Sequence, residues 1–322
     1  MIRVGIIGCG GLGRTHAEQI DTLDGIETVA FCDLIEERAQ EYRDEFTGEY
    51  ATTDPERIFS DERIDAVYVC TLHDTHAEYA IRALRRDQHV LVEKPLALTV
   101  EDCAKVYEAA EASEAILMTA FKMRYYELVR RTRELIPEPL VVTMQMMDDR
   151  WPDDMWANDP EQGGGNVISQ GVHSTDVMRF VAGADPVSVS ARGDNYYQEK
   201  SIIDNMAAIY QFENGAVGNL VQGDAKRPSH VSKFFLQAFD ENAAATLTDR
   251  FTKLIYETDD EREVIHAEES GFLEENRAFR DAIDAGDPAP IDHVDGFLAT
   301  LMILRGFDAI EEERPQTIDL PV

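Results

Sequence analysis

The sequence contains no apolar run that approaches the roughly 18 to 20 residues of a membrane-spanning helix. Its first residues lack the basic stretch, apolar stretch and small-residue cleavage site of a secretory signal. Only four cysteines are present, without paired metal-ligand spacing, and three of them lie in or beside apolar runs. These absences predict a cytoplasmic protein with buried thiols, and they argue against disulfides, a zinc site and membrane association.

Basic residues are scarce as well. Thirty Lys and Arg stand against 63 Asp and Glu, which gives a formal net charge of −33. The acids are spread along the chain, and their field repels nucleic acid and anionic membranes. The same field opposes folding unless salt screens it, since the Debye length falls to about 3 Å at 1 M. The composition therefore favours a halophilic protein of a high-salt cytoplasm over an acidic protein of ordinary salt.

Short apolar runs alternate with helix-like segments over the first 120 residues. Continuous apolar runs indicate strands buried on both faces, and the helices between them indicate parallel crossovers. We therefore predict an α/β doubly wound Rossmann domain over residues 1–121. The apolar runs are 2–7, 28–32, 66–70, 89–92 and 115–119.

The pattern changes after residue 121. Strand-like runs now follow one another, and Asn214-Gly215 between two of them is a strong hairpin signal. Because 322 residues exceed what one core usually serves, we predict a second, α+β domain over 122–322 with a large, mainly antiparallel open sheet. The strand-like runs are 140–147, 186–192, 205–212, 216–222, 233–239, 243–248 and 252–256, and helix-like stretches follow at about 271–285 and 293–312.

A glycine-rich turn follows the first apolar run. Gly8, Gly10 and Gly13 end a strand and open a helix, and Asp33 ends the next strand 20 residues after Gly13. Glycines permit a tight turn and a close approach of the backbone to a pyrophosphate at the helix N-terminus, while the acid can bind ribose hydroxyls. This context predicts a dinucleotide site, against the alternative of a plain strand–turn–helix.

Asp33 also bears on the choice of dinucleotide. Two like charges at about 4 Å repel by roughly 4 kcal/mol at an effective dielectric of 20, so a 2′-phosphate beside Asp33 is penalised. Arg38 could offset part of this repulsion. We expect NAD, with NADP as the alternative.

Charged residues follow the apolar run 89–92, as Glu93-Lys94-Pro95. Ligands of doubly wound sheets bind at the carboxyl ends of the strands. The preceding strand ends in a second polar segment, 71–76, so both loops are expected at the nicotinamide end of the cofactor. The alternative is a surface turn with a local ion pair. Pro95 stiffens the turn through a cis or a trans bond.

A second candidate segment opens a helix at about residue 166. Ser169 and His173 are four residues apart and Asp176 is three further on, so the three side chains share one helix face. A His beside a carboxylate is a base whose tautomer and orientation are fixed. The alternative is a buried His satisfied by a structural Asp.

Three motifs together resemble the glucose–fructose oxidoreductase / inositol dehydrogenase family of NAD(P)-dependent sugar and polyol oxidoreductases. The resemblance spans nearly the whole chain. It implies that Lys94 contacts both the nicotinamide ribose and the reacting substrate oxygen, and that the open sheet forms homo-dimers or homo-tetramers. The motifs, in order, are the glycine loop, Glu93-Lys94-Pro95, and Gly163-Gly164-Gly165 with His173 and Asp176.

The sequence departs from the family pattern at several positions. Leu72 and His73 stand where the family commonly has Pro and Asn, whereas Thr71 and His76 match. Ser169 replaces an Asp that polyol dehydrogenases often carry four residues before the His. Either the base needs no second carboxylate, or the substrate differs, or the neighbouring Gln170 takes the place of the Asp.

The resemblance implies hydride transfer between nicotinamide and a sugar or cyclic polyol, with His173 as acid–base. The alternatives are an NAD-cycling glycosidase and a ligand-sensing regulator without turnover. Predicted catalytic residues are Lys94, His173 and Asp176, and predicted substrate contacts are Lys94, Arg124, Trp151, Ser169 and His173. Predicted cofactor contacts are Gly8, Gly10, Gly11, Leu12, Gly13, Asp33, Arg38, Thr71, His76, Glu93 and Lys94. No metal is expected, because adjacent acids such as Asp148-Asp149 occur by chance in so acidic a chain.

The halophile hypothesis predicts salt-dependent stability. Because salt screens the repulsion among the acids, the melting temperature should rise between about 0.1 and 2 M KCl. A melting temperature that stays constant over this range would contradict the hypothesis.

Overall fold

The computed structural model describes residues 1–268 and 271–321. The chain divides into two compact units, which are described separately. Unit 1 comprises Met1–Phe121 and Phe272–Phe297, and unit 2 comprises Lys122–Gly271 and Leu298–Val322. The sequence predicted one change of domain after residue 121, whereas the chain also returns to unit 1 between Phe272 and Phe297.

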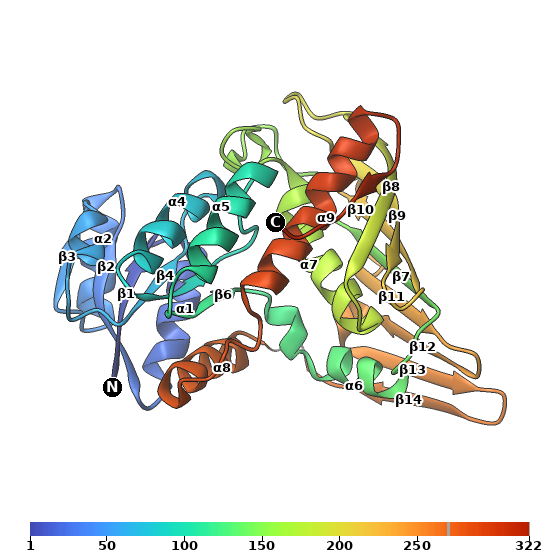
Figure 1. The fold of residues 1–322 in the computed structure, drawn as a ribbon, viewed down its shortest axis with the longest axis horizontal. Helices are drawn as coiled ribbons and strands as arrows, with labels where there is room; N and C mark the ends of the chain where they lie inside the picture. Colours follow the sequence, from blue (N-terminus) through green and yellow to red (C-terminus); the bar gives the residue numbers. More distant parts are fainter. Residues whose placement is uncertain (269–270, 322) are drawn as a thin grey trace. The chain divides into compact units, whose positions relative to one another are not determined.

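Unit 1 contains a six-stranded, all-parallel sheet in the order β3-β2-β1-β4-β5-β6 (Figure 1). The order reverses between β1 and β4, which is the switch point where doubly wound sheets bind ligands. The predicted Rossmann fold is confirmed. Its strands are β1 (Ile2–Ile7), β2 (Ile26–Cys32), β3 (Tyr50–Thr52), β4 (Ala66–Val69), β5 (His89–Val92) and β6 (Leu117–Thr119). Its helices are α1 (Gly11–Asp21), α2 (Glu36–Glu45), α3 (Glu56–Phe59), α4 (His73–Leu84), α5 (Val100–Glu111) and α8 (Phe272–Ala285).

Helix α8 belongs to unit 1 because its aromatic side chains pack there. Phe279 is fully buried, with its ring 5.6 Å from the ring of Tyr68 on β4. Phe272 meets the ring of His16 on α1 edge-on, at 5.8 Å. Burying a Phe side chain contributes about 1.5–3 kcal/mol, so these contacts stabilise α8 on unit 1.

Unit 2 contains a nine-stranded sheet in the order β14-β13-β12-β11-β7-β10-β9-β8-β15. The pair β7/β10 is parallel and the remaining pairs are antiparallel, so the predicted open, mainly antiparallel sheet is confirmed. Its strands are β7 (Val141–Met147), β8 (Pro186–Asp194), β9 (Asn205–Phe212), β10 (Val217–Gly223), β11 (Phe234–Phe239), β12 (Ala243–Thr248), β13 (Lys253–Thr258), β14 (Arg262–His266) and β15 (Gln316–Thr317). Its helical segments are η1 (Lys122–Tyr125), α6 (Glu127–Leu135), η2 (Trp156–Asn158), α7 (Asn166–Ala182), η3 (Asp249–Phe251) and most of α9 (His293–Glu311).

Helix α7 packs on one face of this sheet beside α9, which contacts the same face at β9 (Figure 1). The hydroxyl of Ser174 donates to the Gln222 side chain on β10 at 2.9 Å, and the hydroxyl of Thr175 donates to the Ala299 carbonyl on α9 at 2.7 Å. These contacts on both sides fix the rotation of α7 about its axis, and thereby the direction of the side chains on its remaining face.

The four cysteines are buried and none is in a disulfide. Burial raises the pKa of the Cys32 thiol to about 12 and that of Cys70 well above its usual value. Thiols in this state are protonated at neutral pH and react slowly. Among the described residues, no helix combines the length and the apolar character that a membrane span requires.

Candidate functional site

The glycine turn between β1 and α1 is shaped by close backbone contacts. Gly8 has φ 102°, and a Cβ added there would lie 2.4 Å from the Cys70 carbonyl oxygen. A Cβ on Gly13 would lie 2.0 Å from the Gly8 carbonyl oxygen. No side chain other than hydrogen fits at either position, because such distances lie far inside van der Waals contact.

The middle of the same turn is open. A Cβ added at Gly10 or Gly11 would meet nothing within 4 Å. Helix α1 begins at Gly11 with no side-chain cap and no acid in its first turn, so its N-terminal amide groups are left for an external acceptor. Open space in front of an uncapped helix N-terminus fits a pyrophosphate, which carries negative charge to those amides. The turn therefore fits the predicted dinucleotide.

Asp33, at the end of β2, is held by two backbone hydrogen bonds. Its Oδ2 accepts from the amide of Cys9 at 2.9 Å, and its Oδ1 accepts from the amide of Ile35 at 2.8 Å. The carboxylate thus ties the glycine turn to the end of β2, and it cannot rotate away from a bound ligand without breaking both bonds. The Tyr42 hydroxyl also donates to the Gly10 carbonyl, at 3.1 Å, a contact that sequence reasoning did not find.

The Glu93-Lys94 pair, predicted at the end of β5, is buried rather than on a surface turn. Glu93 is 3% exposed and Lys94 is 8% exposed, and the Lys94–Pro95 peptide bond is cis. Glu93 Oε1 lies 3.2 Å from His16 Nε2, and Glu93 Oε2 accepts from the amide of Lys94 at 3.2 Å. Burial acts to raise the pKa of Glu93, but the hydrogen bond from His16 and the nearby charge of Lys94 help to lower it. The carboxylate is therefore ionised at neutral pH.

His76 links the two loops predicted to face the nicotinamide. Its Nδ1 lies 2.8 Å from the Pro95 carbonyl oxygen and its Nε2 lies 3.2 Å from that of Thr71. Burial lowers the pKa of His76, so the ring is neutral and donates from one nitrogen at a time. Both ring nitrogens thus contact backbone carbonyl groups of the two loops and hold the loops together. His73 is also buried, with its ring 5.5 Å from that of His76.

Unit 2 carries the predicted acid–base residues on α7. Gly165, with φ 92°, precedes the helix, and the side chains of Ser169, His173 and Asp176 on it are all buried. Asp176 Oδ1 accepts from Arg124 Nε at 2.8 Å and forms an ion pair with Arg124 Nη2 at 2.6 Å. Arg124 was predicted as a substrate contact, and the structure gives its guanidinium a second task, which is to hold Asp176.

Trp151 lies in a loop fixed by a buried carboxylate. Its amide donates to Asp224 Oδ2 at 3.0 Å, and its indole N–H donates to Asp148 Oδ2 at 3.4 Å. Asp224 also accepts from the Tyr197 hydroxyl at 2.6 Å and from the Gln198 amide at 3.1 Å. Burial raises the pKa of Asp224. Sequence reasoning missed this acid, although its place directly after β10, at the end of a buried strand, was a usable signal.

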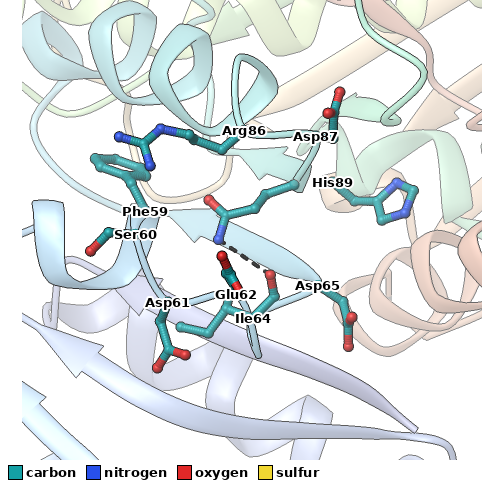
Figure 2. Close-up of a pocket in the computed structure, with 10 residues that line it drawn as sticks. Phe59, Ser60, Asp61, Glu62, Ile64, Asp65, Arg86, Asp87 and His89 are labelled. Atoms are coloured by element: carbon teal, nitrogen blue, oxygen red, sulfur yellow. Dashed lines mark hydrogen bonds between the residues drawn. The ribbon is translucent and has the colours of Figure 1, made fainter.

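The predicted site residues therefore form two groups, one in each unit. Unit 1 contains all the predicted cofactor contacts, whereas unit 2 contains the predicted substrate contacts other than Lys94. Action of Lys94 and His173 on one substrate stays a prediction. A separate pocket lies at the amino ends of β4 and β5 (Figure 2). The side-chain amide of Gln88 donates to the Ile64 carbonyl there, at 3.2 Å. None of the residues that line this pocket is a predicted site residue. Four carboxylates border it and disfavour an anionic ligand. They are those of Asp61, Glu62, Asp65 and Asp87.

The glycine turn yields a prediction that separates folding from binding. Gly13→Ala should lower the free energy of unfolding by about 1–3 kcal/mol, because its Cβ overlaps the Gly8 carbonyl. Gly10→Ala should leave thermal stability without ligand nearly unchanged and weaken NAD binding, because its Cβ occupies the open space. Thermal melts and NAD titration of both variants check this. Equal NAD affinity in wild type and Gly10→Ala would contradict the assignment of the glycine turn, Gly8–Gly13, as the cradle that holds the pyrophosphate.

Comparison with known proteins places the chain in a family. Residues 2–121 match the model described as the oxidoreductase family with an NAD-binding Rossmann fold, and residues 132–236 match the GFO/IDH/MocA C-terminal domain. The two matches together cover more than half of the chain. The first falls in unit 1 and the second in unit 2.

Relatives of similar length support the same assignment. Myo-inositol 2-dehydrogenase of Thermotoga maritima is 24% identical over 97% of both chains. D-xylose 1-dehydrogenase (NADP(+)) 2 of Haloferax volcanii is 26% identical over 96% of both chains. The solved structure of a levoglucosan dehydrogenase in complex with NADH has the same fold, with a TM-score of 0.91 and 21% identity over 99% of this chain and 100% of that one. The chain belongs to the GFO/IDH/MocA family of oxidoreductases with an NAD-binding Rossmann fold.

Proposed function

We propose that this oxidoreductase transfers a hydride between nicotinamide and an alcohol carbon of a sugar or cyclic polyol. The main support is the open glycine cradle at an uncapped helix N-terminus, with a buried lysine at the carboxyl end of a strand of the same sheet. The substrate class rests on relatives named as dehydrogenases of inositol and xylose. When bound, the dinucleotide supplies the hydride acceptor or donor.

Lys94 is proposed to stabilise the substrate oxygen as negative charge develops on it. An ammonium that is 8% exposed acts through a low-dielectric environment, where it stabilises an alkoxide far more than it would in water. The adjacent Glu93 carboxylate compensates the charge of Lys94 in the resting protein. The Glu93 carboxylate thus offsets part of the free energy needed to bury the Lys94 cation at the end of the strand.

His173 is proposed as the general base in oxidation and the general acid in reduction. In oxidation its imidazole takes the hydroxyl proton while Lys94 stabilises the oxygen that remains, and the carbonyl product forms as the hydride leaves the carbon. Asp176 lies about one turn after His173 on α7 and is held by Arg124 from η1. We propose that Asp176 orients the imidazole. Ser169 places a neutral hydroxyl one turn before His173, where related polyol enzymes often carry a carboxylate.

The anchoring of Asp33 supports a preference for NAD. Both carboxylate oxygens accept backbone hydrogen bonds, so a 2′-phosphate nearby would meet a fixed negative charge. At about 4 Å and an effective dielectric of 20 the repulsion is roughly 4 kcal/mol. Arg38 is exposed on α2 and remains the residue that would favour NADP, the cofactor in the name of the Haloferax relative.

The principal experiment combines a substrate screen with two variants. Sugars and inositols are assayed by absorbance at 340 nm, with NAD and with NADP, in high salt. His173→Ala should lower kcat by about a hundredfold or more with near-normal NAD binding, because general base catalysis contributes about 10²–10⁴-fold. Lys94→Ala should lower kcat and weaken NAD binding together. The double variant should lose much less than the product of the two single losses, because groups that act in one step are not additive.

Each alternative function has its own outcome in the same experiment. A redox-cycling glycosidase would retain tightly bound NAD and cleave a glycoside without net NADH. A regulator would bind a sugar but show no turnover with any substrate, in the wild type as in His173→Ala. A full rate in His173→Ala would reject the assigned base, and additive losses in the double variant would separate Lys94 from the chemical step.

We also propose that the open face of the unit 2 sheet binds a second copy of this chain. The face turned away from α7 has no charged residue on its central strands, although 29% of the whole chain is charged. Its apolar residues include Ile209, which is 55% exposed. An uncharged patch on so acidic a protein fits a partner with the same patch. The face consists of Val141, Thr143, Gln145 and Met147 on β7, Val217, Asn219 and Val221 on β10, Ala207, Ile209 and Gln211 on β9, Phe235, Gln237 and Phe239 on β11, and Ala244 and Thr246 on β12.

The oligomer is tested by placing one charge on this face. Ile209→Glu should convert a dimer or tetramer into smaller species, because a self-complementary interface would bury the new carboxylate in every copy. Light scattering coupled to size exclusion in high salt measures the mass. Val231→Glu, at an exposed position outside the face, is the matched control. A monomeric wild type, or an Ile209→Glu variant of unchanged mass, would contradict the proposal.

A further inference from the structure

We propose that His16 and Asn276 are positioning residues that fix the backbone and charge of Lys94 through Glu93. The inference rests on the proposed role of Lys94. The three side chains form a buried row: Asn276 from α8, His16 from α1, and Glu93 at the end of β5. The amide of Lys94 then donates to the same Glu93 carboxylate.

His16 is held on every side. Its Nε2 lies 3.2 Å from Glu93 Oε1, and its ring meets Tyr68 and Phe272 edge-on, with centroids at 5.4 and 5.8 Å. The side chain is fully buried. A ring packed between two aromatic rings has one orientation, so the donor that it presents to Glu93 is fixed in space.

Asn276 satisfies the other ring nitrogen of His16. Its Nδ2 lies 3.0 Å from His16 Nδ1 and also donates to the Phe272 carbonyl at 2.7 Å, while its Oδ1 lies 3.2 Å from His16 Nδ1. The Glu93 carboxylate can only accept hydrogen bonds, so the proton of the His16 ring lies on Nε2, and Nδ1 can then accept from the Asn276 amide. Asn276 therefore supports the tautomer in which the imidazole donates to Glu93.

A structural role alone does not account for these groups. A buried carboxylate at a strand end is costly, and an apolar side chain in its place is often as stable or more so. The buried carboxylate of Glu93 is explained if it is needed to hold the backbone and the charge of Lys94. Lys94 is close enough for its charge to help lower the pKa of Glu93. By linkage, the ionised carboxylate attracts the Lys94 ammonium with the same free energy.

The row also connects the cofactor cradle with Lys94. Helix α1 begins at Gly11 in the cradle and carries His16 little more than one turn later. The helix whose N-terminus would hold the pyrophosphate thus also holds the carboxylate beside Lys94. A shift of α1 on dinucleotide binding would be transmitted to Lys94 through a single side chain.

A double-mutant cycle tests the proposal. His16→Leu should lower kcat, at saturating NAD and substrate, by about tenfold or more, because a hydrogen bond to a buried charge is lost. In the Lys94→Ala background the same change should lower kcat less than about threefold, because the group on which His16 acts is gone. His16→Gln, whose amide can replace Nε2–H, should recover most of the rate. His89→Leu is the matched control, since His89 Nδ1 accepts from the Ile116 amide at the amino end of β5, away from Glu93.

The outcomes separate this inference from the function on which it rests. If Lys94→Ala leaves kcat unchanged, the proposed function fails. If Lys94→Ala lowers kcat while His16→Leu lowers it equally in both backgrounds, the function stands and the positioning role is wrong. Asn276→Leu tests the same row from α8 without altering α1, so the cycle can be completed even if His16→Leu does not fold. Full activity of a folded Asn276→Leu would overturn the role of Asn276.

Discussion

A buried carboxylate must have its charge compensated, and in unit 1 this requirement falls on Glu93. Its partners come from three separated parts of the chain: His16 on α1, Asn276 through that ring from α8, and the Lys94 amide next in sequence. Removing the His16 side chain would leave the buried carboxylate without one of its hydrogen bonds, which costs about 1.5–3 kcal/mol. This one constraint therefore explains why α1 and α8 must both pack beside the end of β5, where Lys94 is buried.

Local sterics explain why the cofactor turn could be predicted from the sequence. Gly8 and Gly13 are required by contacts with neighbouring backbone, and the continuous apolar strands define the parallel sheet. The return of α8 to unit 1 could not be predicted, because an amphipathic helix shows that it has a buried face but not which surface covers it. His16 was missed because a lone His in a helix carries no signal until its partners are known. The Arg124–Asp176 pair was missed for the same reason, since the two residues are 52 positions apart.

The distribution of charge separates surfaces of different use. The formal net charge of −33 repels like-charged molecules, including other copies of the chain. The central strands of the unit 2 sheet nevertheless leave an uncharged face, and the glycine cradle has no acid in the first turn of α1. Acids are thus absent from the two surfaces proposed to receive a partner copy and an anionic cofactor. Where an acid does lie beside the cradle, at Asp33, its carboxylate is fixed by backbone amides and contributes to cofactor choice.

The central claim is that Lys94 and His173 act on the same alcohol oxygen. A crystal structure of the protein with dinucleotide and a substrate alcohol measures this directly. The account predicts that Lys94 Nζ and one His173 ring nitrogen each lie within about 3.2 Å of one substrate oxygen, the reach required for proton transfer and charge stabilisation. An oxygen contacted by only one of these groups, with the other directed into a different cavity, would contradict the account.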